Sequence, residues 1–263
     1  MMILRNKIAL VYGAGGDIGG AVARAFAREG AKVFLSGRTL RKVQAVAADI
    51  ESRGGLAEAS QLDALDESAI DAHLNLVAEK AGGVDISFNA VATSRPLPKL
   101  PLTELSVEDF ALPFTSYTLA NFLTARAAAR RMIAKRSGVI LTITGTPGRM
   151  GFLNVGGTSP AYAAIVALTR TLSAELGPQG VRAICLMPNA IPETALIRES
   201  FGRYAKAAGV SQAELQARFE NLTHLKRLTS LDELASTAAF LASEHASAMT
   251  GTVVNLSGGA VVD

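Results

Sequence analysis

Residues 7–30 read KIALVYGAGGDIGGAVARAFAREG, and this stretch decides the fold. An apolar, β-branched run ends at Tyr12 and predicts a buried strand, while the apolar spacing after the glycines predicts an amphipathic helix. Glycines between a strand and a helix permit a tight turn and let backbone amides approach a pyrophosphate at the positive end of the helix. The order of strand, turn and helix favours a dinucleotide site over a merely structural turn.

The same alternation of short apolar runs and longer amphipathic segments continues along the chain. The runs are KIALVYG, AKVFLSG, the weaker LAEASQLD, VDISFNA, GVILTITG, VRAICLMP and GTVVNLSGG. Strands and helices in strict turn predict an α/β fold, a Rossmann-type parallel sheet with helices on both faces. We expect one domain over residues 1–263, with a helical, polar insertion at about 194–228 in the place of a flap over a substrate.

Composition excludes several classes of function. The 263 residues are 49% hydrophobic, which suits one large core, and 26 basic against 23 acidic residues leave a net charge of only +3. This excess is too small and dispersed to indicate nucleic-acid binding. The single cysteine, Cys185, lies in an apolar run and predicts a buried thiol in a reducing compartment. Without a membrane-length apolar run, we expect a soluble, cytoplasmic protein, and we assign no metal site.

The ends of the first three strands give the first cofactor contacts. We place a pyrophosphate against Gly13, Gly15, Gly16, Asp17, Ile18 and Gly19. A carboxylate beside phosphate is repulsive, so Asp17 is also interpreted as the cap of a helix beginning near Ile18. After the second strand, where an acidic residue would bind the ribose of NAD, stands Arg38; it favours the 2′-phosphate of NADP(H), or is an ordinary solvated arginine. The Asp63 carboxylate either accepts a hydrogen bond from the adenine amino group or caps the next helix.

The chain resembles the short-chain dehydrogenase/reductase family from residue 7 to residue 259. YGAGGDIGG resembles the family's TGxxxGIG, VDISFNAVA resembles VDxLVNNAG, and residues 161–191 resemble its tyrosine-containing helix, following strand and PG segment. Residues 225–259 match the usual ending of the family. The resemblance implies a doubly wound seven-stranded parallel sheet, frequent tetramers, and hydride exchange between NAD(P)(H) and a carbonyl or alcohol. It also implies further cofactor contacts, at Asn89, Ala90, Val91, Tyr162, Pro188, Asn189, Ile191 and Thr194.

The resemblance carries over only part of the family's catalytic set. Tyr162 falls on the tyrosine that exchanges a proton with the substrate, but Val166 occupies the lysine position. Gly145 occupies the serine position, and Tyr117 the asparagine position, with Asn121 one turn further along. The flanking hydroxyls of Thr144 and Thr146, and the phenol of Tyr117, are the candidate replacements.

Without the lysine, Tyr162 should be a poor base, because a free tyrosine has a pKa of about 10. Reduction of a carbonyl does not need this base, since a neutral phenol can still donate a proton to the developing oxyanion. Three functions stay open: an NADP(H)-dependent reductase of a carbonyl, imine or activated double bond; a catalytically impaired NADP(H)-binding sensor or partner subunit; and a lyase or isomerase that keeps the nucleotide structurally.

Substrate and partners are indicated more weakly. An apolar small molecule would suit the side chains expected near the flap, Phe152, Leu153, Ile197, Phe201 and Tyr204, which are alternatively core or interface packing. Small residues in ARAAARRM and AYAAIVAL suit the helices that pair in family tetramers, so we expect a homo-oligomer. A basic helix face could dock an acidic carrier protein, or be simply solvated; its members are Arg126, Arg130, Arg131, Lys135 and Arg136.

Overall fold

The computed structural model describes residues 2–262, and it confirms the predicted seven-stranded parallel sheet. The strand order is β3-β2-β1-β4-β5-β6-β7, and every neighbouring pair is parallel. The strands are β1 (Ile8–Tyr12), β2 (Lys32–Gly37), β3 (Leu56–Gln61), β4 (Ile86–Asn89), β5 (Gly138–Ile143), β6 (Val181–Pro188) and β7 (Val253–Leu256). Each lies within one of the apolar runs of the sequence.

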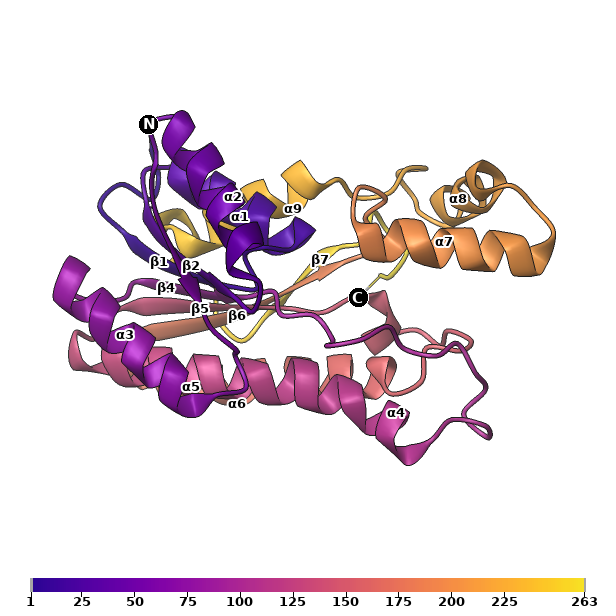
Figure 1. The fold of residues 1–263 in the computed structure, drawn as a ribbon, viewed down its shortest axis with the longest axis horizontal. Helices are drawn as coiled ribbons and strands as arrows, with labels where there is room; N and C mark the ends of the chain where they lie inside the picture. The colour runs from indigo at the N-terminus through magenta and orange to yellow at the C-terminus, as the bar shows by residue number, and fades with distance from the viewer. Residues whose placement is uncertain (1, 263) are drawn as a thin grey trace.

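Helices cover both faces of the sheet, as predicted (Figure 1). Helices α1, α2 and α9 lie on one face, and α3, α5 and α6 on the other. The helices are α1 (Asp17–Arg28), α2 (Leu40–Ser52), α3 (Glu67–Ala81), α4 (Val107–Pro113), α5 (Ala120–Ala134), α6 (Thr158–Leu176), α7 (Ala195–Ala208), α8 (Gln212–Asn221) and α9 (Leu231–Ala242). None of the helices formed by residues 2–262 is long and apolar enough to cross a membrane.

Successive side chains along a strand point to opposite faces of the sheet, where they pack into two separate apolar cores. In β1, Ala9 and Val11 pack under α1 and α9, whereas Leu10 and Tyr12 pack toward α3 and α5. Both sets are buried because helices cover both faces, which is why the strands read as nearly continuous apolar runs. Cys185 is a free, buried thiol in β6, as its apolar surroundings predicted.

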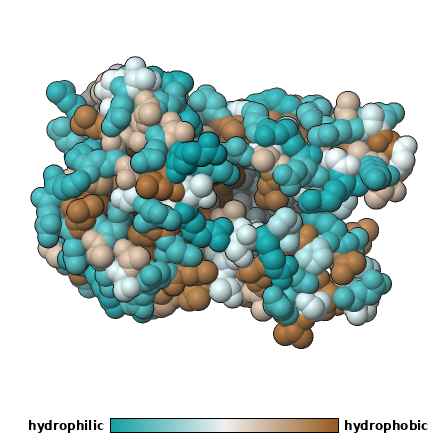
Figure 2. Space-filling model, viewed as in Figure 1, coloured by the Kyte–Doolittle hydropathy of each residue, from teal (hydrophilic) through white to brown (hydrophobic). Residues whose placement is uncertain are grey.

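The strand order reverses at β1, which pairs with β2 on one side and β4 on the other. In open parallel sheets this reversal opens a crevice at the carboxyl ends of the strands, where ligands bind. Helices α7 and α8 extend beyond that edge, and α4 lies opposite them (Figure 1). Figure 2 shows a hollow in the molecular surface between these two parts. The fold therefore places a cleft where a site is expected.

Candidate nucleotide site and active site

The turn after β1 requires glycine at two positions. Gly13 has a φ of +73°, and a Cβ there would lie 2.6 Å from the Ala90 carbonyl oxygen. A Cβ on Gly19 would lie 2.4 Å from the Gly13 carbonyl oxygen. The turn is thus closed against the loop after β4 and against the first turn of α1, with no room for a side chain. Such a turn brings backbone amides to the positive end of a helix, where a pyrophosphate binds.

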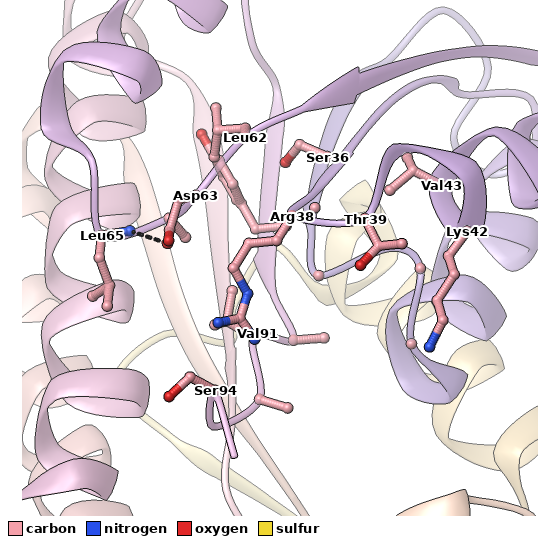
Figure 3. A pocket seen from close by; sticks show the side chains of 18 of the residues that line it. Ser36, Arg38, Thr39, Lys42, Val43, Leu62, Asp63, Leu65, Val91 and Ser94 are labelled. Carbon is pink, nitrogen blue, oxygen red and sulfur yellow. Dashed lines mark hydrogen bonds between the residues drawn. The ribbon is translucent and has the colours of Figure 1, made fainter.

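A cavity of about 250 Å³ begins at this turn and crosses the carboxyl ends of β1 to β4 (Figure 3). Most of its wall comes from the first four strand ends and from the start of α2. Its lining includes Gly13, Gly15, Gly16, Arg38, Asp63, Ala90 and Val91, all predicted cofactor contacts. A nucleotide entering here would meet glycine backbone at one end and the residues after β2 and β3 at the other.

Two cations border the cavity beside the end of β2. Arg38 and Lys42 both line it and are exposed, and neither forms an ion pair with a carboxylate within residues 2–262. In Figure 3 the Arg38 side chain extends toward Val91 and Ser94, while Lys42 lies beyond Thr39. Both are therefore available to a phosphate, which arginine and lysine bind through charge-assisted hydrogen bonds.

Asp63 does not cap a helix, so that alternative was wrong. The cap of α3 is Asp66, whose carboxylate accepts from the Ala69 backbone N–H. The Asp63 carboxylate instead accepts from the Leu65 N–H at 3.0 Å and stabilises the loop that lines the cavity (Figure 3). The sequence offered two aspartates three residues apart, and the helix begins one residue after the second.

Asp17 does not act as a helix cap either. Gly16 is the N-cap of α1, which begins at Asp17 itself. The Asp17 carboxylate accepts a hydrogen bond from the Ala195 N–H at 2.6 Å, at the start of α7. It thereby connects the glycine turn to the helical insertion, a contact between residues far apart in the sequence.

The ends of β4 and β6 hold the remaining predicted cofactor contacts. Asn89 donates from Nδ2 to the Thr124 hydroxyl at 2.9 Å and accepts from the Val91 N–H, so it shapes the loop of Ala90 and Val91. After β6, Thr194 caps α7 and donates to the Ile191 carbonyl at 2.8 Å. None of residues 188–194 lines the 250 Å³ cavity. The next residue, Ala195, donates its N–H to the Asp17 carboxylate, in the first turn of α1.

Two phenols lie in contact at the other end of the site. The ring centroids of Tyr117 and Tyr162 are 5.4 Å apart. Tyr117 lies on a π-helical turn, Phe114–Leu119, and Tyr162 lies on α6. Burial, then the charge of Tyr117 and a hydrogen bond to it, raise the pKa of Tyr162 well above its usual range. Burial also raises the pKa of Tyr117, against hydrogen bonds from Thr93 and Tyr162. Both phenols are therefore neutral at physiological pH.

Comparison with known proteins agrees with this geometry. The model of a family described as enoyl-(acyl carrier protein) reductase matches residues 13–261. The chain belongs to the short-chain dehydrogenase/reductase family. It is 30% identical to the uncharacterized oxidoreductase YxjF of Bacillus subtilis (strain 168), with 97% of this chain and 98% of that protein aligned. It is 29% identical to the 7alpha-hydroxysteroid dehydrogenase of Escherichia coli (strain K12), over 98% of this chain and 95% of that one. The crystal structure of sorbitol-6-phosphate 2-dehydrogenase SrlD from Erwinia amylovora superimposes with a TM-score of 0.91 at 26% identity, covering 97% of this chain and 100% of that chain.

Proteins of the short-chain dehydrogenase/reductase family bind a nicotinamide cofactor. In this member, apolar side chains surround the two phenols of Tyr117 and Tyr162. Val166 packs against the cluster of Tyr117, Ala161, Ile165 and Cys185. A Cβ at Gly145 would lie only 3.1 Å from Cε2 of Tyr162, so the absence of a side chain there makes room for the phenol ring. The site has neither the cation nor the hydroxyl at the positions where the family resemblance places them.

The two candidate hydroxyls of this dehydrogenase/reductase already have partners. The Thr144 hydroxyl is buried and donates to the Leu186 carbonyl at 3.5 Å. The Thr146 hydroxyl donates to Oδ1 of Asn189 at 3.3 Å. Each would have to rotate away from its acceptor to bind a substrate oxygen, so their catalytic roles stay predictions.

Several lining residues escaped the sequence-based analysis of this family member. The polar ones are Ser36, Thr39, Lys42, Ser94 and Ser116. Lys42 lies on the first turn of α2, so its place directly after the second apolar run could have indicated it. Ser116 lies on the π-helical turn, which hydrophobic periodicity and capping residues do not locate.

The predicted basic face of α5 is largely occupied by contacts within the chain. Arg126 pairs with Glu67, Lys135 pairs with Asp85, and Arg131 donates to Asn75. Arg136 donates to the Pro178 carbonyl at 2.8 Å. Arg130 alone of the five has no partner of this kind within residues 2–262. Docking of a carrier protein stays a prediction, and this pairing reduces the free charge available for it.

Proposed function

We propose that this short-chain dehydrogenase/reductase is an NADP(H)-dependent reductase that uses a buried phenol as its acid. The preference for NADP(H) is supported by Arg38 and Lys42, two cations on the nucleotide cavity without an ion-pair partner in residues 2–262. A 2′-phosphate would pair with them, whereas the bare ribose of NAD(H) would leave both charges without a ligand. The glycine turn fits the pyrophosphate, because the turn admits no Cβ at Gly13 or Gly19.

The contact between Tyr117 and Tyr162 is the observation that carries the direction of the reaction. Raised pKa values keep both hydroxyls protonated, and the lysine position is occupied by Val166, which carries no charge. A protonated phenol is a proton donor and a poor base. The pair therefore suits reduction better than oxidation of an alcohol.

In the proposed reaction, bound NADPH supplies the hydride that adds to the substrate carbon. One phenol of the pair donates its proton to the oxygen, or to the nitrogen or carbon of an imine or activated double bond. The second phenol stabilises the resulting phenolate by a hydrogen bond, in surroundings that otherwise disfavour charge. A proton from solvent restores the acid.

A second candidate is a nicotinamide-binding protein without turnover, acting as a sensor or partner subunit. It is favoured by the hydroxyls of Thr144 and Thr146, which both donate to protein acceptors. In this case the nucleotide cavity is functional and the phenol pair is only packing. Cofactor binding is common to both candidates, and turnover separates them.

The proposed substrate is a small molecule with a substantial apolar part. Exposed Leu153 and Leu196 are apolar surface in the segments after β5 and at the start of α7, whereas Phe201 is buried in the packing between α7 and α8. We also propose a homo-oligomer through α5 and α6, because Phe122 of α5 is 40% exposed and the α6 residues Ala163 and Ala167 are exposed. A monomeric mass in solution would contradict this assembly.

The test begins with fluorescence titration of NADPH and NADH, followed by a panel of ketones, enones and imines. We expect tighter NADPH binding, and a loss of about 10- to 100-fold in NADPH affinity when Arg38 and Lys42 are both replaced by alanine. NADH affinity should not change. Arg41→Ala is the matched control, because Arg41 is an exposed cation of α2 that does not line the cavity. Equal affinity for the two nucleotides would contradict the proposal.

A further inference from the structure

A proline-rich segment between β4 and α4 carries one lysine into the region of the hollow. Residues 94–102 read SRPLPKLPL, so Pro98 precedes Lys99 directly, and Pro96 and Pro101 lie within three residues of it. Because proline fixes its own φ and restricts the residue before it, this backbone has little freedom to lose when a ligand binds. Arg95 further anchors the segment through ion pairs with Glu108 and Asp109 at the start of α4.

Lys99 reaches the helix on the opposite side. Its Nζ atom lies 5.9 Å from the ring centroid of Tyr204, on α7. In the view of Figure 1 the segment lies below α7 and leads into α4, and these two parts border the hollow of Figure 2. A cation over an aromatic face is attracted by the ring, so Tyr204 holds the ammonium in place between the two parts of the molecule.

The charges at this contact are all of one sign. Neither Lys99 nor the neighbouring Arg203 pairs with a carboxylate within residues 2–262. Burial, and then the charge of Arg203, lower the pKa of Lys99. Burial raises the pKa of Tyr204, and Arg203 partly opposes this change. The three side chains thus offer hydrogen-bond donors and two like charges, and neither cation has a carboxylate partner among the described residues 2–262.

We infer that Lys99, Arg203 and Tyr204 form a subsite for an anionic group of the substrate, a carboxylate or a phosphate. An anion there would neutralise the two cations and accept from the phenol, as paired charges do in partly buried sites. The substrate is then an apolar carbonyl compound with an acidic end, rather than a wholly apolar one. The inference rests on the proposed function, which makes the hollow a substrate cleft.

The test measures binding rather than turnover. Glutarate, phenyl phosphate and the uncharged dimethyl glutarate are titrated calorimetrically into the protein, both free and loaded with NADPH. We expect one of the anions to bind and the diester to bind at least about tenfold more weakly. Lys99→Gln should weaken anion binding by about tenfold, while Lys99→Arg should retain most of it. The tighter anion identifies the group as carboxylate or phosphate.

Arg218→Gln is the matched control, since it removes an exposed cation from α8 in the same part of the molecule without touching Lys99. It should leave anion binding within about twofold of the unmodified protein. Equal binding of the diester, no binding of either anion, or an equal loss in Arg218→Gln would overturn the inference. Failure of NADPH to bind would instead contradict the proposed function, and the titration of the free protein would still decide the subsite.

Discussion

The nucleotide cavity and the phenol cluster lie at the same edge of the sheet but differ in how their polar groups are used. Around the cavity, Arg38 and Lys42 have no ion-pair partner in residues 2–262, and the glycine turn is fixed by backbone geometry alone. Around the phenols, the hydroxyls of Thr144 and Thr146 donate to acceptors of the protein. The comparison indicates that the cofactor site depends on the backbone of a turn that only glycine can form at Gly13 and Gly19. The chemistry at the phenols depends instead on single polar side chains, and an apolar residue such as Val166 can take the place of one of them.

The largest expected effect is that of removing a phenol hydroxyl, which should lower turnover and leave cofactor binding unchanged. If one of the two phenols is the acid, Tyr162→Phe or Tyr117→Phe lowers kcat of reduction by about 10²- to 10⁴-fold, the usual contribution of a positioned acid. NADPH affinity should stay within about twofold, because the change removes only a hydroxyl. Steady-state kinetics and fluorescence titration measure the two quantities. The tyrosine whose loss is larger is the one that donates.

The pH dependence gives an independent check on the same acid. Raised pKa values mean that both phenols keep their protons far into alkaline solution. The reduction rate should therefore be flat from about pH 6 to about pH 9, since the donor is fully protonated throughout. A rate that falls with a midpoint near neutral pH would show that another group is the acid.

The next largest effect is expected at the backbone turn after β1. Gly13→Ala places a Cβ 2.6 Å from the Ala90 carbonyl oxygen at a φ of +73°. We expect a loss of about 2–4 kcal/mol in the free energy of unfolding, from the left-handed backbone and the overlap together. Urea unfolding measures it, and NADPH binding should be lost with the shape of the turn.

Gly54→Ala separates these two causes. Gly54 has a similar φ of +80°, but no atom lies within 4 Å of the added Cβ. It should cost only about 1–2 kcal/mol of unfolding free energy and leave NADPH binding unchanged. Equal costs at the two positions would show that the Ala90 loop moves aside, and that the turn is less constrained than the nucleotide site requires.

Sequence patterns were informative where local rules apply. The seven apolar runs located the strands, and the glycines and Arg38 located the cavity, because strand burial and turn geometry depend on neighbouring residues. The error at Asp63 was local, because two aspartates three residues apart could each cap α3. At Asp17 the deciding partner lies far along the chain. The capping role given to Asp17 was wrong because its partner, Ala195, is 178 residues away. The hydrogen bonds of Thr144 and Thr146 to residues at the end of β6 likewise depend on how strands pair.

The smallest expected effect is at Asp17, where the two regions are connected. Its carboxylate lies in the first turn of α1, beside the proposed pyrophosphate position, and accepts from the Ala195 N–H. Asp17→Asn keeps an oxygen acceptor for that hydrogen bond and removes the negative charge. Because the carboxylate repels bound phosphate, we expect NADPH affinity to rise by about two- to fivefold at low ionic strength. Salt screens exposed charges, so the gain should shrink as salt is added.

The outcome of that titration decides what the contact between Asp17 and Ala195 does. A salt-dependent gain in affinity would mean that the carboxylate opposes the nucleotide and contributes mainly by holding α7. A loss of affinity would mean that the charged hydrogen bond, stronger than its neutral replacement, positions the insertion for the cofactor. In the second case the glycine turn and the cleft act as one site, and the separation between a preserved cofactor region and an altered catalytic region would no longer hold.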